Sequence, residues 1–178
     1  MPTRADLGQI VLAAEFAARK HRMQRRQDRD ATPYINHPLA LAKMLWTEGR
    51  VRDTTVLATA LLHDTIEDTR TTRAELVRNF GASVANVVAE VTDDKRLAKA
   101  TRKRLQVEHA PHLSARAKLV KLADKTCNLR DVAKNPPTGW PIRRRREYFD
   151  WAKSVVDGLR GTNRRLEAAF DRAFRHRP

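Results

Sequence analysis

The chain has 178 residues, 41% of them apolar, and this length and composition suit one compact domain with a sizeable core. A single cysteine excludes an internal disulfide framework. Because there is no signal-peptide stretch and no strongly apolar segment longer than residues 56–62, we expect a cytoplasmic protein without membrane spans. The net charge of +15 favours anionic partners, namely nucleic acid, an acidic membrane surface or phosphorylated small molecules.

Hydrophobic residues recur at helical spacing along most of the chain, and no convincing pair of strands is predicted. We expect helices over residues 7–22, 38–48, 53–68, 72–81, 84–91, 95–108 and 114–132, and from residue 144 onward with an interruption near Gly158 and Gly161. The polar stretch 23–36 and the proline-containing stretch 134–142 are predicted loops. The pattern predicts an all-α fold, with a single domain over residues 1–178 and a core at about 7–174.

Several helix ends carry recognisable signals. Pro38 suits the first position of its helix, which places His37 at the mouth of that helix. Thr72 and Glu75 have the spacing of a capping box, and Gly81 is expected to end the helix that they begin.

The most apolar predicted helix ends in a run of ionisable residues, His63-Asp64-Thr-Ile-Glu67-Asp68. Since residues three and four apart share a helix face, a continuous helix would crowd the three carboxylates together and place His63 beneath Glu67. Like charges at this spacing destabilise a helix, and a divalent metal is an economical counter-cation for histidine and carboxylate together. The cluster is equally well interpreted as a solvated helix end that pairs with nearby arginines.

Two further segments carry candidate ligands. His37 precedes a helix, where a lone histidine is more often a capping or packing residue than a ligand. In the helix over 114–132, Asp124 lies beside the core stripe and is expected to be half buried, with Lys121 and Lys125 flanking it. A salt bridge from Asp124 to either lysine is the simpler interpretation.

His37, then His63-Asp64, then Asp124 follow the order H…HD…D of the HD phosphohydrolase superfamily, which the chain resembles. Longer segments are more specific, and over about residues 7–174 they resemble stand-alone small alarmone hydrolases, relatives of the hydrolase half of SpoT. These segments are YINHP, ALLHDTIEDT, FGASVANVVAEVTDDK, KRLQVEHAPH, AKLVKLADKTCNLRD and GTNRRLE.

The resemblance implies an all-α HD-type helical bundle. It also implies manganese-dependent removal of pyrophosphate from the 3′ position of guanosine tetra- or pentaphosphate. On this basis the expected ligands of one Mn²⁺ are His37, His63, Asp64 and Asp124. Glu67 and Asp68 are expected to orient or deprotonate the attacking water. Ligand chemistry alone does not select manganese, because Mn²⁺ binds such sites more weakly than the other first-row divalent ions do.

The resemblance also implies contacts to the substrate. Arg26 and Lys99 are expected to contact phosphates, with Lys121 a further cation in the matching segments, since phosphate groups need cationic partners. Asn128 is expected at the ribose and Trp140 or Tyr148 at the base. Relatives often carry a lysine where this chain has Gln27, a difference expected to weaken phosphate binding or to shift substrate preference.

Two other functions remain open at this stage. The same HD chemistry can act on another nucleotide, such as the 2′-phosphate of NADPH or a deoxynucleotide. The net charge and the run Arg143–Arg146 also fit a nucleic-acid-binding module, but no zinc-finger or helix-wing signature supports it. Cys127 is expected to be a small buried filler, or else to lie near the metal and make activity sensitive to oxidation. The sequence does not predict an oligomeric state.

Overall fold

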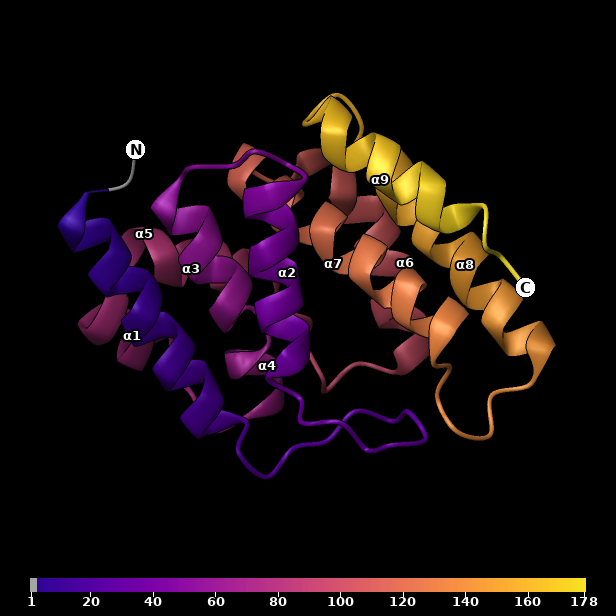
Figure 1. Cartoon of the computed structure of the whole chain (residues 1–178), viewed down its shortest axis with the longest axis horizontal. Coiled ribbons are helices and arrows are strands. Elements are labelled where there is room, and N and C mark those ends of the chain that lie inside the picture. The colour runs from indigo at the N-terminus through magenta and orange to yellow at the C-terminus, as the bar shows by residue number, and fades with distance from the viewer. Residues whose placement is uncertain (1–2) are drawn as a thin grey trace.

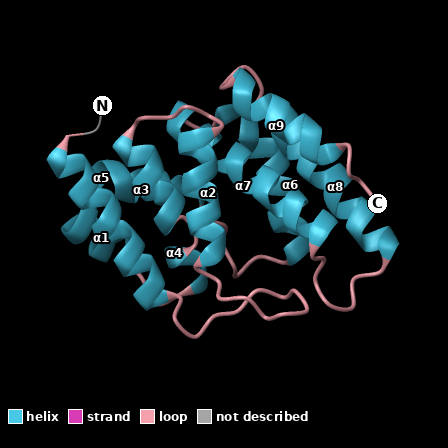
Figure 2. Ribbon diagram, viewed as in Figure 1, coloured by secondary structure: helices cyan, strands magenta, loops and turns pink. Residues whose placement is uncertain are grey.

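The computed structural model describes residues 3–178, and every regular element in that part of the chain is a helix (Figure 2). The elements are α1 (Arg4–Lys20), α2 (Asn36–Thr47), α3 (Thr54–Leu62), α4 (Thr65–Asp68), α5 (Arg73–Val91), α6 (Lys99–His109), the 3₁₀ turn η1 (Ala110–His112), α7 (Ala115–Lys134), α8 (Ile142–Asp157) and α9 (Arg164–Phe174). The predicted all-α fold is confirmed for residues 3–178. None of the helices in this range is both long enough and apolar enough to cross a membrane.

The helices form two packed groups that share α3 (Figure 1). On one side α1 and α5 pack against α3 and bury a cluster that includes Phe16 and Leu76. On the other side α2 and α7 pack against α3, with α8 and α9 on α7, and their cluster includes Leu122 and Phe170. The short helix α4 lies near the lower end of α2 in Figure 1. The two long loops predicted from the sequence join α1 to α2 and α7 to α8.

Two buried helices, α3 and α7, run through the interior and provide rigid supports. Every residue of α3 from Val56 to Leu62 is buried. The Asp53 carboxylate caps the start of α3 by accepting from the Thr55 amide at 2.9 Å. The Ser114 hydroxyl caps the start of α7 in the same way, by accepting from the Ala117 amide at 3.2 Å.

The predicted helix over residues 53–68 is wrong in one respect, because it is interrupted at His63 and Asp64. Asp64 has φ −97° and ψ 0°, outside regular helix geometry. The Thr65 hydroxyl donates to the Leu62 carbonyl oxygen at 2.7 Å, and such local side-chain bonds compete with a regular helix. The spacing rule for a continuous helix therefore does not apply to His63 and Glu67.

Other helix boundaries also differ from the prediction by a few residues, and two of them concern candidate residues or their neighbours. α2 begins at Asn36, so His37 lies inside the first turn and not in front of the helix. α6 begins at Lys99 and not at residue 95, because the Asp94 carboxylate accepts from the Arg96 amide at 3.0 Å and holds the preceding residues in a turn.

The other helix-end signals are confirmed in part, since one of the two bonds of the capping box at Thr72 is present and the Glu75 carboxylate pairs with Lys20 instead. The Thr72 hydroxyl accepts from the Glu75 amide at 3.1 Å. Gly81 has φ 82°, a backbone conformation that residues with a side chain rarely adopt, and it divides α5 at the predicted point. Gly158 ends α8, and Gly161 has φ 85° in the turn before α9.

Candidate functional site

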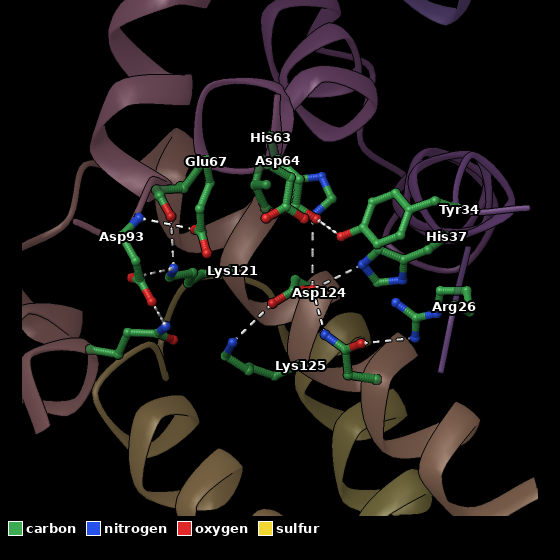
Figure 3. A pocket seen from close by; sticks show the side chains of 15 residues that line it. Arg26, Tyr34, His37, His63, Asp64, Glu67, Asp93, Lys121, Asp124 and Lys125 are labelled. Carbon is green, nitrogen blue, oxygen red and sulfur yellow. Dashed lines mark hydrogen bonds and ion pairs between the residues drawn. The ribbon is translucent and has the colours of Figure 1, made fainter. Parts of the chain in front are cut away.

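Three side chains from three segments meet in the interior (Figure 3). His37 comes from α2, His63 from the break between α3 and α4, and Asp124 from the middle of α7. All three are buried, and one possible ligand atom of each lies within 4.8 Å of the others. His37 Nε2 is 3.2 Å from Asp124 Oδ1, and His63 Nε2 is 4.0 Å from the same oxygen. The structure thus brings together three of the four expected metal ligands.

The His63 ring is oriented as in a metal ligand. Its Nδ1 donates to the Ala60 carbonyl oxygen at 2.9 Å, which leaves the lone pair on Nε2. This Nε2 is buried and has no partner in hydrogen-bond geometry, although Asp64 Oδ2 lies 2.8 Å away. A cation can bind the lone pair of Nε2 in place of the proton that the Asp64 and Asp124 carboxylates favour there when no cation is present. The residues present therefore fit a divalent metal ion.

Asp124 divides its two oxygens between the cluster and a counter-ion. Oδ2 accepts from the Lys125 ammonium at 2.9 Å, while Oδ1 faces the imidazoles and accepts from the Asn128 amide at 2.6 Å. Burial opposes ionisation of this carboxyl, but Lys125 and His37 outweigh burial and hold its pKa well below the ordinary value. The salt bridge to Lys125 and a place in the histidine cluster, alternatives in the sequence, therefore occur together. Asp124 is also more buried than expected, with 9% of its surface exposed.

Asp64, the fourth expected ligand, lies at the edge of the cluster. Its Oδ2 accepts from the Tyr34 hydroxyl and faces His63 (Figure 3). Burial lowers the pKa of the His63 imidazole, but the carboxylates of Asp64 and Asp124 outweigh burial and raise it to about 9. Burial likewise raises the pKa of Asp64, and His63 and His37 more than reverse this and hold it below the ordinary value. Negative charge thus surrounds the imidazoles, as a cation site requires.

Glu67 and Asp68 occupy different environments. Glu67 Oε2 accepts from the backbone amide of Asp93 at 3.1 Å, and burial raises the pKa of this carboxyl. Asp68 Oδ2 accepts from the Gln24 amide at 2.9 Å, and its other oxygen accepts from the Lys95 ammonium. Burial therefore favours proton uptake by Glu67, whereas Asp68 is held in place by two donors.

An inner cavity and a wider groove meet at this cluster. The inner cavity has a volume of about 180 Å³ and contains the carboxylates described above. The groove has a volume of about 660 Å³ and is lined largely by the loops that follow α1 and α7. Both spaces are lined by Arg26, Tyr34, His37, Asp68 and Asn128, so the groove opens onto the cluster. Such a pair offers a narrow place for a reacting group and a larger place for the body of a ligand.

Five of the six residues expected to bind substrate line these spaces, and four of the five line the groove. Trp140 and Tyr148 line the groove, with ring centroids 5.6 Å apart. Arg26 and Asn128 line both spaces, and the Arg26 guanidinium donates to the Asn128 side chain at 3.3 Å and to Asp131 at 2.7 Å. Aromatic, amide and guanidinium groups therefore face one groove.

The two lysines expected at phosphates lie differently. Lys121 lines the inner cavity, but it is buried and its ammonium donates to the Val91 carbonyl oxygen at 2.8 Å. Burial, together with the neighbouring Lys125, lowers the pKa of Lys121. Lys99 is exposed at the start of α6 and lines neither space. The structure therefore ties Lys121 to the fold and places Lys99 at the surface.

Among the side chains of the site that had no role assigned from the sequence, two contact the expected carboxylates directly. Tyr34 lies three residues before His37, and its place in the segment YINHP was an available signal. Gln24 contacts Asp68 across 44 residues of sequence, and no local pattern predicts such a contact.

A buried cluster of two histidines and an aspartate, built on adjacent helices of an all-α fold, defines the class of protein. The chain belongs to the HD domain family, whose sequence model matches residues 13–150. This confirms the family expected from the sequence.

Individual relatives are similar over nearly the whole chain. The guanosine-3′,5′-bis(diphosphate) 3′-pyrophosphohydrolase MESH1 of Xenopus tropicalis is 58% identical over 170 residues, which cover 96% of this chain and 95% of that protein. The Homo sapiens protein of the same name is 57% identical over 173 residues, 97% of each chain. The solved structure of a metazoan ortholog of SpoT that hydrolyzes ppGpp has a TM-score of 0.93 and 49% identity, covering 99% of this chain and 97% of that one.

Proposed function

We propose that this protein hydrolyses guanosine 3′,5′-bis(diphosphate), and its pentaphosphate counterpart, to GDP or GTP and pyrophosphate. The observation that carries the proposal is the cluster of His37, His63 and Asp124, which lies beside Glu67 and Asp68 at the inner end of a groove. Relatives that bear this activity in their names match nearly the full chain at 58% and 57% identity.

On this proposal the ion is Mn²⁺, held by His37, His63, Asp64 and Asp124. The unpartnered, buried Nε2 of His63 supports a metal in this position. Histidine and carboxylate ligands are compatible with Mn²⁺ but do not select it, so its identity rests on the family resemblance. When bound, a divalent cation neutralises charge that develops on a phosphoryl oxygen and lowers the pKa of a water molecule.

The carboxylates beside the ligands then have separate tasks. Glu67, whose pKa is raised by burial, accepts the proton of the attacking water. Asp68, held between Gln24 and Lys95, orients that water by accepting a hydrogen bond from it. Tyr34 holds the Asp64 carboxylate in position through its hydroxyl.

The groove binds the nucleoside and the remaining phosphates. Trp140 and Tyr148 provide aromatic surface for the base, and Asn128, which lines both spaces, contacts the ribose on this proposal. Arg26 can contact a phosphate through two N–H groups at once. Lys99 and Lys121 are also proposed to act on the phosphates, Lys121 from the wall of the inner cavity.

The test is a substrate comparison with metal-stripped protein that is then supplied with Mn²⁺. Guanosine tetraphosphate, NADPH and a deoxynucleoside triphosphate are offered separately and in competition, and released phosphate and pyrophosphate are measured. We expect GDP and pyrophosphate from guanosine tetraphosphate, only with the metal present. Preferential release of phosphate from NADPH, or turnover of the deoxynucleotide alone, would contradict the proposed substrate.

A further inference from the structure

His21, which follows α1, is buried without an evident packing reason for being a histidine. Only 2% of the surface of His21 is exposed, and its Nε2 is buried with no hydrogen-bond partner. An apolar side chain would fill the same space without an unsatisfied polar atom. The other ring nitrogen, Nδ1, lies 2.7 Å from Gln24 Oε1 and is therefore the polar atom that this histidine uses.

The contacts of Gln24 set the direction of a hydrogen-bond chain. Gln24 Nε2 donates to Asp68 Oδ2 at 2.9 Å, since a carboxylate can only accept. The amide oxygen then faces His21, so His21 Nδ1 donates to it. The backbone of Gln24 is fixed as well, because its N–H donates to the His21 carbonyl oxygen at 2.9 Å and its carbonyl accepts from the Tyr34 amide at 3.1 Å.

The same histidine also contacts the other side of the site. The His21 and Tyr34 rings lie 4.8 Å apart between centroids, tilted by 34°. The Tyr34 hydroxyl in turn donates to Asp64. One buried side chain thus contacts both the residue that binds Asp68 and the residue that binds Asp64.

From these contacts we propose that His21 and Gln24 are positioning residues, which hold the Asp68 carboxylate in its working orientation through the chain from His21 to Gln24 to Asp68. This inference rests on the proposed function, because Asp68 is assigned there to the attacking water. Lys95, the other partner of Asp68, has a side chain that is 49% exposed and reaches the carboxylate from the surface. The half-buried amide of Gln24 therefore provides the more rigid of the two contacts.

The first test compares Gln24→Met with Gln9→Met. Gln9 matches Gln24 because it is also half buried and also donates through Nε2, in its case to the Phe80 carbonyl oxygen at 3.2 Å. It serves as a control because it lies on α1 and lines neither the inner cavity nor the groove. Loss of a partner behind a functional group typically lowers activity by about 10- to 100-fold. We expect kcat for guanosine tetraphosphate to fall in this range in Gln24→Met, with KM within about twofold, and both to be unchanged in Gln9→Met. Wild-type kcat in Gln24→Met would overturn the proposal.

The second test changes His21 in two ways. Asn retains a donor near the position of Nδ1, whereas Phe retains the ring beside Tyr34 and removes the donor. We expect kcat to be lowered less in His21→Asn than in His21→Phe, in samples that unfold at similar temperatures. The reverse order would show that the ring contact with Tyr34, and not the hydrogen bond, supports activity.

A double variant separates positioning from a general structural effect. If Gln24 acts only through Asp68, Gln24→Met has no further effect on kcat once Asp68→Asn is present. Additive losses would contradict the chain. Failure of the proposed function gives a different result, because wild-type protein with Mn²⁺ would then not hydrolyse guanosine tetraphosphate in the same assay.

Discussion

The inner cavity and the groove are built in opposite ways. In the cavity, buried charged groups hold one another, as the Asp124 carboxylate does with Lys125 and Asn128. In the groove, Trp140 and Tyr148 are half buried and contact each other edge to face. When one member of a hydrogen-bonded cluster is changed, the others lose their partners too, so the effect is large. Half-exposed contacts contribute separately to the free energy of binding. We therefore expect large effects on turnover from changes in the cavity and graded effects on affinity from changes in the groove.

The largest effect is expected for His63→Ala. A metal ion contributes several kcal/mol of charge stabilisation in the transition state, which corresponds to a loss of more than roughly 1,000-fold in kcat when the site is destroyed. Hydrolysis of guanosine tetraphosphate and bound metal are measured in the same preparation, and helicity is checked by circular dichroism. The control is His109→Ala, which changes an exposed histidine of α6 and is expected to leave both unchanged. Appreciable turnover in His63→Ala would contradict the expectation that changes in the cavity affect turnover more than changes in the groove do.

The next effect concerns Glu67→Gln, which keeps the shape of the side chain and removes its basicity. General-base catalysis contributes roughly 100- to 10,000-fold, and we expect a loss of kcat near the lower end, about 100-fold. The control is Glu108→Gln, because Glu108 is exposed on α6 and paired with Arg104.

The pH dependence of the wild type follows from the same residue. A base acts only when deprotonated, and burial raises the pKa of Glu67 above its ordinary value of 4.5. Activity is therefore expected to fall as the pH drops through this raised pKa, so the acid limb lies above the usual range of a glutamate. The limb is measured at saturating Mn²⁺ and is expected to be absent in Glu67→Gln. An identical acid limb in the variant would assign it to another group.

A smaller effect, on KM, is expected for Trp140→Ala. Stacking of a base on an aromatic ring is worth about 1–3 kcal/mol, which corresponds to a rise in KM of roughly 5- to 150-fold with little change in kcat. Trp46→Ala is a matched control, since Trp46 is also half buried and also lies under an arginine. The distance from the guanidinium carbon to the ring centroid is 3.6 Å for Arg52 over Trp46 and 4.2 Å for Arg144 over Trp140. A fall in kcat comparable to that of His63→Ala would show that the groove also takes part in turnover.

The smallest effect is expected for Gln27→Lys. Gln27 lines the groove, and its carbonyl oxygen accepts from the Thr138 amide at 2.7 Å, a backbone contact that the substitution retains. An exposed ion pair contributes about 0.2–1 kcal/mol, so the added cation is expected to lower KM by no more than about fivefold. The gain should shrink as salt is raised, because exposed charges are screened. A KM that is unchanged at low salt would exclude Gln27 from the phosphate-binding surface.

Many helices, helix caps and candidate ligands of the two regions could be predicted from local sequence. The apolar run of α3 and the caps at Thr72 and Ser114 depend on residues close in the chain, and the structure confirms them. The ligand candidates were recognisable because His63 and Asp124 lie in distinctive segments. These features require no knowledge of which helices pack together.

The features that the sequence did not predict have two causes. The break at His63 and Asp64 was missed because the spacing rule assumes a continuous helix and ignores the local bond from Thr65 to Leu62. The burial of Lys121 follows from the approach of α5, whose Val91 carbonyl oxygen accepts a hydrogen bond from the Lys121 ammonium. The contact of Gln24 with Asp68 joins residues 44 positions apart. The contacts of Lys121 and Gln24 join distant segments and have no local signature.

The most direct test of the central claim is a titration of metal-stripped protein with Mn²⁺, in which bound metal and pyrophosphate released from guanosine tetraphosphate are measured in the same samples. A metal site at His37, His63 and Asp124 predicts that activity rises in proportion to bound metal and reaches its plateau at about one ion per chain, and that His63→Ala neither binds the ion nor hydrolyses the substrate. Full turnover before metal is added, or in His63→Ala, would contradict it.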